Sequence, residues 1–132
     1  MSNVSVVEAF INAIRCGDVE TALNQLDEDV HVSEPARMPL GLGGDYNGKR
    51  SFIGFLHNIA AVYDVKVRGM KVIDGDDLAV ALVDLTWTAH STGASLETQF
   101  CELYTVSAGK ITGINVFPKD TAALHEIAVG PQ

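Results

Sequence analysis

Residues 29–35 read Asp-Val-His-Val-Ser-Glu-Pro, and this stretch predicts a short strand that ends in a carboxylate. Side chains alternate between the two faces of a strand, so Val30, Val32 and Glu34 would share one face. A carboxylate at the end of an apolar row is unusual, because ionised carboxylates are rarely buried without a partner. Pro35 would stop the strand directly afterwards. We interpret Glu34 either as a carboxylate at the mouth of an apolar pocket or as a solvated residue at the end of an ordinary strand.

The segment after this strand, residues 36–44, is apolar in its first half and rich in glycine in its second half. Met38 lies in the apolar half. Next to a pocket, such a segment would form a hydrophobic flap over Glu34, with Met38 among the residues that contact a ligand. Beside a solvated strand end, it would be an ordinary loop.

The composition is that of an ordinary globular chain, with 47% apolar and 20% charged residues among 132, and we expect one domain that spans residues 1–132. The net charge of −8 and the scattered basic residues argue against nucleic-acid binding, which needs clustered positive charge. No run of about 18 apolar residues is present, so no membrane span is expected. The first residues lack the pattern of a signal peptide, and Cys16 and Cys101 lie far apart, which indicates reduced thiols in a cytoplasmic protein.

Hydrophobic periodicity divides the chain into a helical half and a strand half. Apolar residues at helical spacing predict helices at residues 4–15, 19–26 and 49–63. From residue 64 the period changes to 2, which predicts four strands and a short final helix at residues 65–73, 78–91, 95–106, 111–117 and 121–127. Short connections make neighbouring strands antiparallel. The expected fold class is therefore α+β, with a curved antiparallel sheet wrapped over three N-terminal helices and a conical cavity between them.

Three stretches carry a resemblance to a known family. They are residues 10–18 (Phe-Ile-Asn-Ala-Ile-Arg-Cys-Gly-Asp), residues 29–35 quoted above, and residues 108–111 (Ala-Gly-Lys-Ile) before the last strand. In their order and spacing they resemble the NTF2-like superfamily, and within it the SnoaL-like polyketide cyclases and the ketosteroid isomerases. The resemblance extends from the first helix to residue 120 and implies an NTF2-like cone.

The resemblance implies a role for Glu34 but not for the rest of the isomerase site. Glu34 falls where ketosteroid isomerases place the aspartate that shuttles a proton beside a carbonyl. The positions from which those enzymes donate hydrogen bonds to the enolate oxygen are occupied here by Phe10, Leu56 and Cys101. The aspartate that SnoaL-like cyclases carry on the last strand corresponds to Val116.

The phase of each strand completes the list of expected pocket residues. On the strand at 78–91, the face with Trp87 is chosen because the alternate face is polar. If Cys101 points inward, so does Gln99, and if Val116 points inward, so does Ile114. The expected substrate-binding residues around Glu34 are therefore Phe10, Met38, Phe55, Leu56, Trp87, Gln99, Cys101, Ile114 and Val116.

The leading functional hypothesis is a small cofactor-independent isomerase, cyclase or dehydratase. Glu34 would abstract a proton next to a carbonyl of a small hydrophobic substrate, and Gln99 or the indole N–H of Trp87 would orient the oxygen. The alternative is a non-catalytic binding module of the NTF2-like type that holds a small lipophilic ligand or a partner protein. No set of His, Asp and Glu residues has the spacing of metal ligands, so neither a metal nor another cofactor is expected.

The opposite face of the sheet would carry aromatic residues mixed with threonines. With Cys101 facing inward, this outer face would hold Thr86, Thr88, Phe100, Glu102 and Tyr104. Exposed aromatic side chains are typical of protein interfaces. We therefore expect a homodimer that forms through this face.

Overall fold

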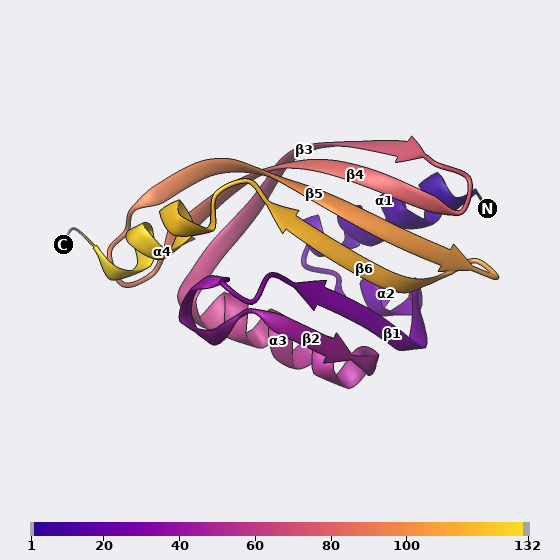
Figure 1. Ribbon diagram of the computed structural model, residues 1–132, viewed down its shortest axis with the longest axis horizontal. Helices are drawn as coiled ribbons and strands as arrows, with labels where there is room; N and C mark the ends of the chain where they lie inside the picture. Colours follow the sequence, from indigo (N-terminus) through magenta and orange to yellow (C-terminus); the bar gives the residue numbers. More distant parts are fainter. Residues whose placement is uncertain (1, 131–132) are drawn as a thin grey trace.

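The computed structural model describes residues 2–130 and has an α+β architecture, in which a curved sheet covers the N-terminal helices (Figure 1). The predicted fold class is confirmed. In chain order the elements are α1 (Asn3–Arg15), α2 (Val19–Asn24), β1 (Leu26–Glu34), the 3-10 helix η1 (Pro39–Gly41), β2 (Gly44–Asn47), α3 (Gly48–Val62), β3 (Tyr63–Asp74), β4 (Leu78–Ala89), β5 (Ser95–Ser107), β6 (Lys110–Pro118) and α4 (Thr121–Val129).

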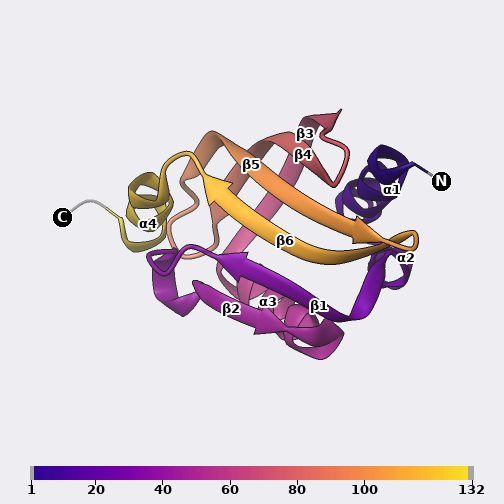
Figure 2. The same cartoon turned by 45° about the vertical axis from the view of Figure 1, so that its right-hand side comes forward.

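The strands form one sheet in the order β2-β1-β6-β5-β4-β3. Neighbouring strands are antiparallel except for β1 and β6, which run parallel. A parallel pair needs a long connection, and here the chain between the two strands contains α3 and four further strands. Figures 1 and 2 show α1, α2 and α3 on one face of the sheet, whereas α4 lies at its end and contacts η1.

Two local predictions around β1 were wrong. The second helix, expected to reach residue 26, ends at Asn24, and β1, expected from residue 29, begins at Leu26. The strand starts early because Leu26 is buried and pairs with Ile111 of β6. Residues 44–47, for which no strand was expected, form β2, which pairs with β1.

The alternation of inward and outward side chains along β1 and β4 is present as predicted. Val30 and Val32 are buried on the same face as Glu34. Along β4 every second residue is buried, and Trp87 is among them. Burying each of the larger apolar side chains on this face, such as Val30, Val32 and Leu85, contributes about 1.5–3 kcal/mol, so these two strands fix which face of the sheet meets the helices.

The loop after Glu34 folds back tightly on itself at one glycine. A Cβ atom on Gly43 would overlap the carbonyl oxygen of Pro35 and lie 2.9 Å from backbone atoms of Ala36. Only a residue without a side chain allows this close approach of two backbone segments. Gly43 therefore determines the path of the chain directly after Glu34.

Gly43→Ala should destabilise the protein by about 1–3 kcal/mol, because the backbone of Pro35 and Ala36 must move to admit the methyl group. Gly54→Ala is the matched control, because Gly54 lies in α3 and a Cβ atom there meets nothing within 4 Å. That control should gain about 0.5–1 kcal/mol from helix propensity. Urea unfolding of both variants measures the two effects, and equal stability of the two would contradict this account of the loop.

Candidate functional site

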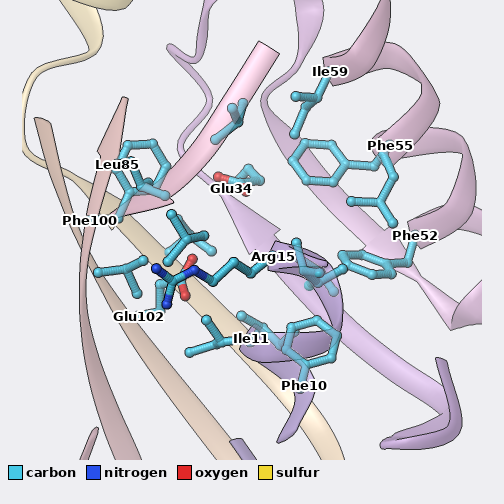
Figure 3. Close-up of a pocket in the computed structure, with 18 of the residues that line it drawn as sticks. Phe10, Ile11, Arg15, Glu34, Phe52, Phe55, Ile59, Leu85, Phe100 and Glu102 are labelled. Carbon is cyan, nitrogen blue, oxygen red and sulfur yellow. The ribbon is translucent and has the colours of Figure 1, made fainter. Parts of the chain in front are cut away.

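A cavity of about 170 Å³ lies between the helices and the sheet. Its walls are mostly aliphatic and aromatic side chains from α1, α3, β1 and β3 to β6 (Figure 3). Three charged side chains interrupt this apolar lining: Arg15 from α1, Glu34 from β1 and Glu102 from β5. Apolar walls with a few polar groups are typical of sites that bind small molecules.

Glu34 occupies the end of β1 and is only 7% exposed. Its Oε2 atom is buried and has no hydrogen-bond partner among the described residues. The strand places it there because Glu34 follows Val30 and Val32 on the inward face and pairs with Gly44 of β2. A carboxyl oxygen held dry without a partner favours the protonated form of the group.

The environment raises the pKa of Glu34 to about 8. Loss of hydration is the main cause, and the negative charge of Glu102 adds to it. Loss of hydration also raises the pKa of Glu102, although the hydroxyl of Tyr104 donates a hydrogen bond of 2.8 Å to its Oε1 atom and opposes the shift. The cavity therefore contains two carboxyl groups that both hold protons more tightly than a solvated glutamate.

Trp87 supplies a donor without a partner in the same cavity. The Nε1 atom of its indole is buried and makes no hydrogen bond within the described part of the chain. The ring is held by stacking on Phe100 at 5.5 Å and by an edge contact with Tyr63 at 4.9 Å. A buried N–H that packing fixes in place can donate to an oxygen atom of a ligand.

Most of the side chains expected at the pocket line this one cavity. From the helices and the sheet these are Phe10, Glu34, Phe55, Leu56, Trp87, Ile114 and Val116. Met38 does not line it. Its side chain is buried in the loop before η1, so the structure assigns this residue to the core.

The expected inward direction of Gln99 and Cys101 is wrong. Val83 of β4 faces the cavity, and its pairing partner on β5 is Phe100, so the neighbours of Phe100 point outward. Gln99 is exposed and donates a hydrogen bond of 3.1 Å to Asp84 on the outer face. The register between β4 and β5 thus decides which side chains of β5 face the cavity. A shift of the register by one residue would turn every side chain of the strand to the opposite face.

The same register brings Phe100, Glu102 and Tyr104 into the cavity, where sequence reasoning had placed them on the outer face. One signal could have revealed this. Phe100 and Tyr104 share a face of β5, and two large aromatic residues at a spacing of four in a strand indicate the buried side. Arg15 was not predicted either, because an arginine in the last turn of a helix is usually solvated.

Within residues 2–130, no three His, Cys, Asp or Glu side chains gather in a way that could hold a metal ion. In the same residues, every helix is too short or too polar to cross a membrane.

The sequence profile of the SnoaL-like domain matches residues 7–114. The chain therefore belongs to the SnoaL-like domain family, and its fold is NTF2-like. An NTF2-like protein of unknown function from Burkholderia pseudomallei K96243 has 24% identity and a TM-score of 0.90, covering 98% of this chain and 100% of that one. No curated protein matches the chain.

Two further solved structures are similar to it. TerC, co-crystallised with polyporic acid, has 25% identity and a TM-score of 0.89, with 97% of this chain and 98% of that chain covered. A protein from Pseudomonas putida KT2440, provisionally assigned as a polyketide cyclase, has 19% identity and a TM-score of 0.79, with 89% and 91% covered.

The raised pKa of Glu34 predicts a loss of stability with rising pH. Between pH 4.5 and about 8 the folded state keeps a proton that the unfolded state has released, so each increase in pH favours unfolding. The free energy of unfolding should fall by roughly 2–4 kcal/mol from pH 5 to 8. Glu34→Gln should remove most of this fall, whereas Glu97→Gln, at an exposed position of β5, should retain it. Urea titrations across this range measure the effect, and identical pH profiles for all three proteins would contradict it.

Proposed function

We propose that the protein is a cofactor-independent enzyme of the isomerase or cyclase type, which moves a proton next to a carbonyl of a small hydrophobic substrate with Glu34 as general base. The observation that carries the proposal is the buried, unpartnered carboxyl oxygen of Glu34 in a mostly apolar cavity. Membership of the SnoaL-like family supports an activity of this class. The similarity to TerC, whose structure holds polyporic acid, supports a small-molecule ligand.

The reaction needs two groups that share the cavity, a base and a hydrogen-bond donor. The carboxylate of Glu34 removes a proton from the carbon next to the carbonyl, and the electrons of the C–H bond move onto the carbonyl oxygen. The indole N–H of Trp87 can donate a hydrogen bond to this oxygen, which lowers the energy of the enolate. Glu34 then returns its proton to another atom of the substrate, so the enzyme is restored.

The raised pKa of Glu34 sets the fraction of this side chain that is ionised and can act as a base. With a pKa of about 8, roughly one-tenth of Glu34 is ionised at pH 7, and the fraction increases as pH rises. A carboxylate that is dehydrated in this way is a stronger base than one in water. Proton abstraction should therefore become faster with pH and reach a plateau above about pH 8.

Glu34→Gln should abolish proton abstraction without removing the cavity. The measurement is exchange of the hydrogen atoms next to the carbonyl of 2-tetralone, a flat two-ring ketone, in deuterated buffer by proton NMR. The native protein should accelerate exchange, and the variant should lose about 10²–10⁴-fold of this rate, the usual contribution of a general base. Glu97→Gln is the control on an exposed face of β5 and should match the native rate. Equal exchange by native protein and Glu34→Gln would exclude Glu34 as the base.

The same protonated carboxyl favours a second candidate, a binding module without catalysis. At neutral pH the neutral form of Glu34 can donate a hydrogen bond to a carbonyl of a lipophilic ligand and hold it in place. Saturable binding of 2-tetralone with no accelerated exchange at any pH would favour this candidate over the enzyme.

We further propose a homodimer through the outer face of the sheet. Phe117 of β6, at 50% exposed, and Ile73 of the edge strand β3, at 44% exposed, are large exposed apolar residues, and Phe117 pairs with Cys101 across β5 and β6. Apolar side chains exposed together on a sheet are typical of an interface.

Phe117→Asp should therefore convert a dimer into a monomer. Sedimentation equilibrium at micromolar concentration measures the mass of native protein and variant. Val19→Asp introduces the same charge at an exposed apolar position of α2 and should leave the dimer intact. A monomeric native protein at this concentration would end the proposal.

A further inference from the structure

Arg15 reaches into the cavity that contains Glu34. It lies in the last turn of α1 and is the only basic residue that lines this cavity within the described chain. Figure 3 shows its aliphatic stem leaving the helix and its guanidinium group pointing toward the side of the cavity on which Glu102 lies. The exposed side chain of Arg15 therefore brings a cation to a mostly apolar cavity that also contains two carboxyl groups.

The guanidinium group of Arg15 is not engaged by the protein. The ion pairs within the described residues join His31 to Asp45, Lys49 to Glu28 and His90 to Asp64. None involves Arg15, and its guanidinium also makes no side-chain hydrogen bond in this part of the chain. Its five N–H donors are thus available to a group that enters the cavity.

The balance of charge in the cavity differs from that of the whole protein. The chain carries a net charge of −8, yet burial raises the pKa values of both carboxyl groups of the cavity, Glu34 and Glu102, and the pKa of Glu34 reaches about 8. With Glu34 mostly protonated at neutral pH, the guanidinium of Arg15 is opposed by less negative charge in the cavity than the net charge of the chain suggests. This favours binding of an anionic group beside Arg15.

We propose that Arg15 binds an acidic oxygen of the ligand, so that the substrates of this site are small, flat apolar acids or enols with one ionised oxygen at the rim. This inference rests on the proposed function, because it concerns the same cavity. A guanidinium group holds a carboxylate or enolate oxygen through paired N–H donors. The apolar part of such a ligand would then lie among Phe10, Phe52 and Phe55, which Figure 3 shows on the walls beside it.

The size of the cavity limits this class further. A closed apolar cavity of about 150 Å³ accommodates one benzene ring, and the cavity here measures about 170 Å³ and is lined in part by the exposed Arg15. One or two fused rings with an acidic group at one end fit this description. An acid held in this way would place its ring between Arg15 and the carboxyl group of Glu34.

The test compares 2-naphthoate with 2-naphthamide, which has the same rings but no charge. Trp87 is the only tryptophan of the chain, so its indole N–H gives one NMR signal that reports directly on the cavity. Titrations at pH 7 should show that the native protein binds 2-naphthoate about tenfold more tightly than 2-naphthamide. Arg15→Met should reduce this ratio to about one, and Arg15→Lys should restore part of it.

Arg50→Met is the matched control, because Arg50 is an exposed arginine of α3 that does not line the cavity. It should retain the tenfold ratio. Equal affinity of the native protein for the two probes, or an unchanged ratio in Arg15→Met, would overturn the inference.

Failure of this inference can be separated from failure of the proposed function. Equal binding of the two probes would remove the role of Arg15 but leave exchange of the neutral 2-tetralone by Glu34 intact. Tighter binding of 2-naphthoate than of 2-naphthamide, without exchange of 2-tetralone, would contradict proton transfer by Glu34 and support the role of Arg15. A Trp87 signal that moves with neither probe would overturn the role of Arg15, and absence of 2-tetralone exchange as well would overturn both.

Discussion

Removing a carboxyl group from water without giving it a partner costs free energy, and the fold imposes this cost on Glu34. Burial of Val30 and Val32 of the same strand, which are packed against the helices, offsets this cost. The result is a site whose chemistry follows from dehydration. Glu34 holds its proton to higher pH, Glu102 nearby has the same tendency, and both groups face a cavity that has few other polar atoms.

The architecture explains how so small a chain maintains such a site. The outer end of β1 is flanked by β2 and β6, so the backbone on both sides of Glu34 is fixed by strand pairing. The close approach of Gly43 to Pro35 fixes the exit of the chain. Stacking of Trp87 on Phe100 holds the indole rigid in the opposite wall. A base and a donor that rigid elements position in advance need little reorganisation when a ligand arrives.

Sequence alone was sufficient where one face of a strand was unambiguously apolar. Val30 and Val32 oriented β1, and Trp87 oriented β4, because the period-2 signal is local. It failed on β5, where both faces mix polar and apolar residues and the orientation depends on pairing with β4. Cys101 was taken as inward by resemblance, which reversed the strand. Arg15 could not be identified either, because only the tertiary structure brings the end of α1 to the cavity.

The central claim is that Glu34 is dehydrated, and the most direct test is its pKa. A carbon-13 NMR titration of the side-chain carboxyl groups would follow each glutamate, with the signal absent from Glu34→Gln assigned to this residue. We expect a midpoint of about 8, far above the 4.5 of a solvated glutamate. A midpoint near 4.5 in the native protein would mean that the carboxyl is hydrated, and it would contradict both the site and the function proposed for it.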